Sequence, residues 1–218
     1  MIGAEPGKAG AEIERKAEIE RKFLLRESAA AAVIAGLSGR ALTQGYFAPI
    51  DGWSVRVRLS AAQTQETDAT AWLNLKSQQP GAVREEIEGA LPVDLARQLL
   101  AGLPAAQLVS KIRYRRPYAD GADLAWEIDR FRGRHDGLWL AEIELPRADY
   151  PLDLPDWLGA EVTADPRYRN AALAQAGASD MPPPAPPELD KAVRRLLREA
   201  DRAIPDGAMP GPDACDAA

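Results

Sequence analysis

The chain has 218 residues, of which 46% are hydrophobic and 28% are charged, and its formal net charge is −6. This length is sufficient for one domain with a proper core and a small appendage, and the negative charge argues against a nucleic acid polymer as the main ligand. The longest apolar run near the N-terminus, residues 29–35, is far shorter than the roughly 18 residues of a membrane span, and residues 1–10 contain no apolar signal-peptide core. We therefore expect a cytoplasmic protein with no membrane partner.

The chain contains one cysteine and one histidine. Cys215 lies in a tail rich in Pro, Gly and Asp, which excludes an internal disulfide and a metal site built from cysteines. The single histidine, His135, excludes most zinc sites, and any Ser-His-Asp arrangement would depend on it alone. Because His135 falls in a predicted turn, we expect a surface residue rather than a catalyst.

A charged five-residue motif, EIERK, occurs twice near the N-terminus, at residues 12–16 and 18–22. As a β-strand, the second copy places Glu18, Glu20 and Lys22 on one face. As a helix, the same residues would form an ordinary exposed i,i+4 pair. A single strand through both copies would be about 45 Å long, well beyond the usual 17–20 Å, so only one copy is expected in the core strand. Since the second copy continues into the apolar sequence FLL, we predict that it forms this strand and that the first copy is an exposed extension, which could be helical.

The rest of the sequence alternates between strand and helix patterns. Strands are predicted where apolar and polar residues alternate, and helices where apolar residues recur at helical spacing between capping and breaking residues. Strands are expected at residues 44–47, 53–59, 71–76, 83–88, 108–114, 124–131, 138–145 and 161–163. Helices are expected at residues 27–37, 92–103, 165–176 and 188–204, the last of them preceded by a stiff proline-rich linker at residues 181–187.

Alternation along the predicted strands gathers charges of both signs on one face. The acidic pairs on this face are Glu18/Glu20, Glu86/Glu88, Glu127/Asp129 and Glu142/Glu144, and the basic residues are Lys22, Arg56, Arg58, Lys76, Arg84, Lys111, Arg113 and Arg115. A solvated sheet surface would explain the charged residues of any single strand. Across all the strands, however, such a surface would be expected to show more Ser, Thr and Gln. If about eight strands close with this face inward, the interior is wide enough for one small ligand. Buried charges have to be paired or bound to metal, and a polyphosphate with divalent cations satisfies both signs.

The ordered series of these motifs resembles the CYTH domain of the triphosphate tunnel metalloenzymes. The resemblance covers residues 18–176 and rests on EIERKFLL, QGYF, VRVRL, LNLK, REEIE, KIRY, WEIDRF, AEIEL and EVTADPRYRNAAL. It implies an α+β fold, with an eight-stranded antiparallel β-barrel that forms a triphosphate tunnel, helices packed outside and a C-terminal helical appendage. The expected domains are an N-terminal extension (residues 1–16), the tunnel domain (17–177), and a linker with an amphipathic helix and a disordered tail (178–218). The duplicated motif and the tail depart from the compact members of the family.

The resemblance also implies a site for a triphosphate-containing small molecule with Mg²⁺ or Mn²⁺. The implied metal ligands are led by Glu18, Glu20, Glu142 and Glu144, with Glu86, Glu88, Glu127 and Asp129 supplementing them or orienting water. The implied substrate-binding residues are Lys22, Arg56, Arg58, Lys76, Arg84, Lys111 and Arg113. Of these, the residues with implied catalytic roles are Lys22, Arg58, Lys76 and Lys111.

The expected function is metal-dependent hydrolysis of inorganic triphosphate or of a nucleoside or other organic triphosphate, by transfer of a phosphoryl group to water. Two alternatives stay open: an adenylyl cyclase-type lyase acting on ATP, and a non-catalytic module that binds polyphosphate. The apolar stripe of the last helix has to pack somewhere, either against a tunnel mouth or against a second copy in a homodimer. Because the proline-rich linker is expected to decouple this helix, we predict that truncation after residue 176 keeps activity.

Overall fold

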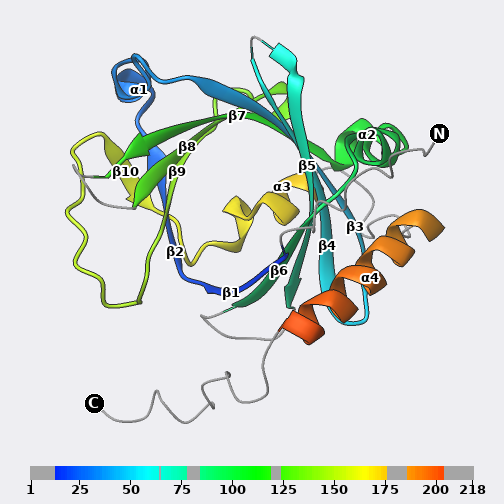
Figure 1. Ribbon diagram of the computed structural model, residues 1–218. Helices are drawn as coiled ribbons and strands as arrows, with labels where there is room; N and C mark the ends of the chain where they lie inside the picture. The colour runs from blue at the N-terminus through cyan, green and yellow to red at the C-terminus, as the bar shows by residue number, and fades with distance from the viewer. Residues whose placement is uncertain (1–12, 64, 78–83, 119–123, 176–185, 204–218) are drawn as a thin grey trace, which may run out of the picture.

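The computed structural model describes residues 13–63, 65–77, 84–118, 124–175 and 186–203. Within these ranges ten strands form one antiparallel sheet in the order β1-β6-β5-β4-β3-β7-β8-β9-β2-β10 (Figure 1). The strands are β1 (Ile13–Glu18), β2 (Glu20–Leu25), β3 (Gly39–Ile50), β4 (Trp53–Ala62), β5 (Gln65–Ser77), β6 (Arg84–Ala90), β7 (Leu108–Pro117), β8 (Ala125–Phe131), β9 (Trp139–Glu144) and β10 (Leu158–Glu161).

Helices lie on both sides of this sheet and at its ends. The described residues form α1 (Glu27–Val33), α2 (Val93–Ala101), α3 (Asn170–Gln175), α4 (Pro187–Ala203) and the short 3-10 helices η1 (Ala105–Gln107), η2 (Gly133–His135) and η3 (Pro166–Tyr168). All four α-helices overlap the helices predicted from the sequence. No helix in this part of the chain combines the length and the apolar composition needed to cross a membrane.

The predicted eight-stranded closed barrel is wrong. In the described residues the sheet has ten strands, β1 and β10 are its two edges, and no backbone pairing joins one edge to the other. The sheet is nevertheless strongly curled, and α3 lies on its concave side (Figure 1). The count exceeds eight because the duplicated motif supplies two strands instead of one, and because β10 adds a further strand beside β2.

The two copies of the motif form consecutive strands that pair with different partners. β1 pairs with β6 and β2 pairs with β9, and only Ile19 separates β1 from β2. The helical alternative for the first copy is therefore wrong, because residues 13–18 form an edge strand of the sheet. The expectation that no single strand runs through both copies is met, because the chain divides into two short strands.

The outer face of β4, β5 and β6 is apolar and packs against α2 and α4. Val55, Leu75 and Ile87 on this face are at most 1% exposed, and they share one hydrophobic cluster with residues of both helices. The buried residues that α4 adds to this cluster are Leu189, Val193, Leu196 and Ala200. A Cβ atom at Gly89 of β6 would lie 2.5 Å from Leu196 Cδ1, so the glycine leaves room for the helix to approach the strand. The expected decoupling of the last helix is wrong, because α4 is part of the core.

A second cluster covers the outer face of β2, β8 and β9. Phe23 and Trp126 meet edge to face with ring centroids 5.8 Å apart, and Val33 of α1 packs in the same cluster. On the concave side, Phe131 packs with Leu173 of α3 in a third cluster. Helix α3 therefore covers one apolar end of the concave face, and the charged part of that face is left for a cavity.

Candidate active site

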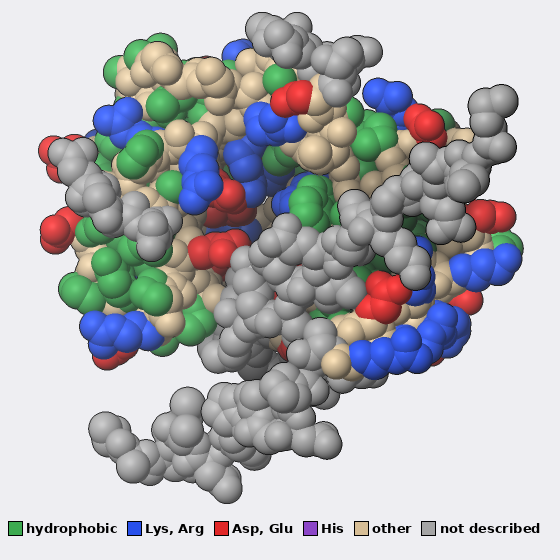
Figure 2. Space-filling view, viewed as in Figure 1, with side chains coloured by type: hydrophobic (Ala, Val, Ile, Leu, Met, Phe, Trp, Pro, Cys, Tyr) green, Lys and Arg blue, Asp and Glu red, His purple; other side chains and the backbone are tan. Residues whose placement is uncertain are grey.

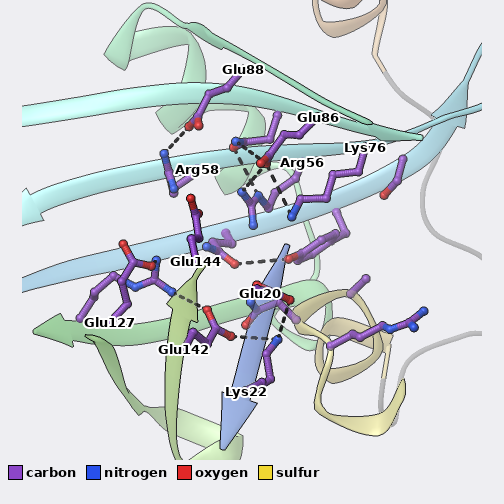
Figure 3. A pocket seen from close by; sticks show the side chains of 18 of the residues that line it. Glu20, Lys22, Arg56, Arg58, Lys76, Glu86, Glu88, Glu127, Glu142 and Glu144 are labelled. Carbon is purple, nitrogen blue, oxygen red and sulfur yellow. Dashed lines mark hydrogen bonds and ion pairs between the residues drawn. The ribbon is translucent and has the colours of Figure 1, made fainter. Parts of the chain in front are cut away.

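A cavity of about 500 Å³ lies on the concave side of the sheet. Charged side chains gather around the hollow at the centre of the molecule (Figure 2), and they point toward one another from facing strands (Figure 3). The residues that line it are Glu20, Lys22, Gln44, Tyr46, Ser54, Arg56, Arg58, Asn74, Lys76, Ser77, Glu86, Glu88, Arg113, Glu127, Glu142, Glu144, Arg169, Asn170 and Ala171. Apart from Ser77 and residues 169–171, the lining comes from alternate positions of β2 to β9, as expected for residues that share one face of a pleated sheet.

The described lining contains equal numbers of acidic and basic side chains. The six carboxylates are Glu20, Glu86, Glu88, Glu127, Glu142 and Glu144, and the six cations are Lys22, Arg56, Arg58, Lys76, Arg113 and Arg169. Such a cavity is close to neutral as a whole. An anionic ligand therefore has to take cations from their carboxylate partners, and the released carboxylates then favour a metal ion.

The wall formed by β4, β5 and β6 pairs its charges around Glu86. Its Oε1 atom lies 3.6 Å from Lys76 Nζ and 3.8 Å from Arg56 Nη2. Asn74 donates a hydrogen bond of 3.4 Å to the same oxygen and accepts one of 3.3 Å from Arg56 Nε. The neighbouring Arg58 forms an ion pair with Glu88 (Figure 3). Two arginines and a lysine are thus held side by side along this wall, at a spacing suited to a row of phosphoryl oxygens.

The Arg56 and Arg58 guanidinium groups experience different fields. Burial lowers the pKa of Arg56, but Tyr46 and Glu86 outweigh burial and the pKa is raised. The pKa of Arg58 is lowered, first by burial and then by repulsion from the neighbouring arginine. Burial and the neighbouring arginine thus both disfavour the charged form of Arg58, and an added negative charge nearby would offset both effects.

The opposite wall, formed by β2, β8 and β9, centres on Glu142. Lys22 Nζ lies 2.9 Å from Glu142 Oε1 and 3.4 Å from Glu20 Oε1. Burial lowers the pKa of Lys22, but these two carboxylates outweigh it and raise the pKa. In the same way, burial raises the pKa of Glu142, but Lys22 and the nearby cations outweigh it and hold the pKa well below its ordinary range. Both groups are charged at neutral pH.

Arg113 connects this wall to the residues beneath it. Its guanidinium group pairs with Glu127, lies 3.1 Å from Glu142 Oε2, and donates two hydrogen bonds of 2.7 and 2.6 Å to Asp129. Lys111 Nζ lies 2.5 Å from Asp129 Oδ2, and both side chains are at most 1% exposed. Lys111 and Asp129 are thus not among the lining residues, and they contact the cavity through Arg113.

Most of the residues implied by the motifs are brought together in this cavity. Glu18 and Arg84 lie opposite one another in the register of β1 and β6, and their side chains fall outside the described part of the structure. The lining residues that the sequence reasoning missed are Gln44, Tyr46, Ser54, Asn74, Ser77, Arg169, Asn170 and Ala171. Asn74 could have been found, because it shares strand parity with Lys76. Nothing local marks Arg169 or Asn170, which reach the cavity from the chain at the start of α3.

Comparison with known proteins identifies the family. The family model described as the CYTH domain matches residues 11–173. This chain belongs to the CYTH family. The resemblance of the strand motifs is confirmed, and α4 lies beyond the matched residues.

Among CYTH relatives, a protein from Acetivibrio thermocellus named inorganic triphosphatase is 35% identical over 158 residues, which cover 72% of this chain and 93% of that protein. A Nitrosomonas europaea protein of the same name is 34% identical over 161 residues, which cover 72% of this chain and 96% of that protein. A crystal structure described as an inorganic triphosphatase is 32% identical, covers 72% of this chain and 93% of that chain, and has a TM-score of 0.49.

The carboxylates of this CYTH cavity have the chemistry of a site for a hard divalent cation. Glu20 lies directly opposite Glu144 in the register of β2 and β9, and like charges at such positions are unfavourable without a cation nearby. In the described residues, no three Asp, Glu, His or Cys side chains already converge on one metal position. The arrangement suits an ion such as Mg²⁺, which commonly takes one or two carboxylates from the protein and further oxygens from a phosphate substrate and water.

Proposed function

We propose that this protein hydrolyses a triphosphate in the charged cavity, with the help of a divalent cation. The observation that carries the proposal is the set of six cations interleaved with six carboxylates on facing strands. A triphosphate needs several cations close together, and a divalent cation needs carboxylates beside them. The two CYTH relatives named inorganic triphosphatase support the same activity.

Inorganic triphosphate is the substrate that this lining favours. Tyr46 is the single aromatic residue among the described lining residues, and its hydroxyl donates a hydrogen bond of 3.3 Å to Gln44 Oε1. Bases are commonly held by stacking on aromatic side chains or guanidinium planes, and the three strand arginines of the cavity, Arg56, Arg58 and Arg113, are engaged by carboxylates and Asn74. A charged lining without an apolar slot selects the phosphate chain itself.

The reaction consumes one water and breaks one phosphoanhydride bond, giving orthophosphate and pyrophosphate. Arg56, Arg58 and Lys76 bind the phosphate chain from one wall, and Lys22 and Arg113 approach it from the other. These cations stabilise charge that develops on the transferring and leaving groups, which is the main task of a protein in phosphoryl transfer. Their carboxylate partners hold them in place before the substrate arrives. Mg²⁺ or Mn²⁺, held by Glu20 and Glu144, would neutralise phosphate charge and supply an acidic bound water.

The test is to incubate the purified protein with inorganic triphosphate, ATP or thiamine triphosphate, each with Mg²⁺, with Mn²⁺ or with excess chelator. Phosphorus NMR identifies the products. We expect triphosphate to give orthophosphate and pyrophosphate only when the metal is present. Cyclic AMP and pyrophosphate from ATP would instead indicate a cyclase. Tight binding of triphosphate without turnover would indicate a polyphosphate-binding module, and either result would overturn the proposal.

A further inference from the structure

A second, smaller cavity of about 230 Å³ adjoins the first. The two share Arg58, Arg113 and Glu127 in their linings, so these three residues stand between them. The lining that belongs to the second cavity alone is Ser38, Arg40, Leu42, Ser60 and Arg115. A second space therefore adjoins the first cavity on the far side of these arginines.

The second cavity differs from the first in its balance of charge. Its described lining contains four arginines and one carboxylate, that of Glu127. Arg40 is additionally paired with Asp68, 2.8 Å from Nη1, and its Nε donates a hydrogen bond of 3.0 Å to Ser60 Oγ. Arg115 is exposed, and within the described residues its side chain makes no ion pair or hydrogen bond. Arg58 and Arg113 also have carboxylate partners outside this lining, Glu88 and Asp129, so Arg115 is the one cation of the described lining without a carboxylate partner.

The positions along β4 place the second cavity directly beyond the arginines that line the first cavity. Ser54, Arg56, Arg58 and Ser60 share one strand face; the first two line only the first cavity, Arg58 lines both, and Ser60 lines only the second. Ser54 and Ser60 are about 20 Å apart at a rise of roughly 3.3–3.4 Å per residue. A path lined by cations thus runs from one cavity through Arg58 to the other.

We propose that the second cavity is a phosphate subsite, in which Arg115 and Arg40 bind a phosphoryl group and the hydroxyls of Ser38 and Ser60 lie within the same lining. Guanidinium groups match phosphate oxygens, and Arg115 lines this cavity without a carboxylate partner among the described residues. Two ligands share the required chemistry: orthophosphate released by hydrolysis, and the fourth phosphoryl group of a linear phosphate chain longer than triphosphate. The inference rests on the proposed triphosphatase activity for the origin of these ligands.

The first arm of the test measures inhibition of triphosphate hydrolysis by orthophosphate. If the subsite holds orthophosphate while substrate occupies the first cavity, inhibition is mixed rather than purely competitive. Arg115→Gln should raise the inhibition constant of the non-competitive component about 5-fold, and Arg40→Gln with Arg115→Gln should raise it further, with kcat/KM for triphosphate nearly unchanged. Arg147→Gln is the matched control, because Arg147 is exposed on a loop and pairs with Asp149 away from both cavities.

The second arm compares linear tetraphosphate with triphosphate as substrates. If the subsite holds a fourth phosphoryl group, the double variant should lose tetraphosphate kcat/KM about 5-fold or more relative to triphosphate. Arg115→Glu provides a folded alternative should the double variant unfold, since Arg115 makes no described contact that the fold needs. Purely competitive inhibition and an unchanged substrate ratio in all variants would overturn the subsite.

Phosphorus NMR titration of orthophosphate into the substrate-free protein separates the two proposals. Binding that weakens in Arg115→Gln, in a protein without triphosphate turnover, would overturn the proposed function and keep the subsite. Triphosphate turnover together with orthophosphate binding that does not depend on Arg115 would keep the proposed function and overturn the subsite.

Discussion

The two faces of β4, β5 and β6 are built from alternating residues of the same segments, yet they are stabilised in different ways. On the outer face Val55, Leu75 and Ile87 are fully buried under α2 and α4. On the concave face Arg58 and Glu86 are held by ion pairs and hydrogen bonds. Burial of apolar area on the outer face is favourable outright, whereas charges on the concave face gain only what remains after desolvation. The outer face therefore carries most of the stability, and the concave face holds the charges on which the proposed triphosphate site depends.

Removal of one carboxylate from the concave face should cause the largest loss of activity, with little change in the free energy of unfolding. We expect Glu20→Gln and Glu144→Gln each to lower metal-dependent kcat by roughly 100-fold or more, the scale of losing one group that stabilises transition-state charge. The free energy of unfolding should change little or rise, because the two carboxylates lie directly opposite one another. Steady-state kinetics and denaturant unfolding check both statements.

The matched control for these variants is Glu27→Gln, which removes an exposed carboxylate from α1. It should leave both kcat and stability near those of the parent protein. Metal-dependent rates that stay unchanged in both Glu20→Gln and Glu144→Gln would show that these residues do not hold the cation.

A change on the outer face should produce the opposite result. Leu196→Ala opens a cavity between α4 and β6 and should lower the free energy of unfolding by about 3 kcal/mol. We expect kcat/KM to stay close to that of the parent protein at temperatures where the variant is folded. Arg198→Ala, an exposed change on the same helix, should stay within about 0.5 kcal/mol. A stability unaffected by Leu196→Ala would argue against the docking of α4.

The smallest effect concerns pH and the buried Glu142. Its folded-state pKa is lowered, so its ionised form contributes stability above the ordinary glutamate pKa of about 4.3, and this contribution is lost as the pH falls through the lower folded-state value. The difference in unfolding free energy between the parent protein and Glu142→Gln should therefore be constant near neutrality and shrink below about pH 5. Denaturant titrations at several pH values measure it. If this difference in unfolding free energy instead grows as the pH falls, the pKa of Glu142 is not lowered in the folded state, and the pairing with Lys22 is contradicted.

Strand parity made most of the candidate site predictable. Arg56 and Arg58 share a face because side chains alternate along any strand, whichever neighbour the strand pairs with. Parity alone also grouped Lys111 with Arg113, but the two occupy different environments. Lys111 lies deeper, where Asn170 accepts a hydrogen bond of 3.3 Å from it and Phe131 packs 5.3 Å away. The depth of a side chain depends on what covers that end of the sheet, and here α3 covers it.

The amino-acid sequence by itself determined which face of each strand is charged, where the α-helices form, and the family, because alternation, helical periodicity and motif order are properties of short stretches. The tertiary structure decided that the duplicated motif splits at Ile19 into two strands with different partners. It also decided that α4 docks over Gly89, and that Arg169 joins the cavity. Each of these depends on contacts between residues far apart in the chain, and local patterns do not encode which distant residues will meet.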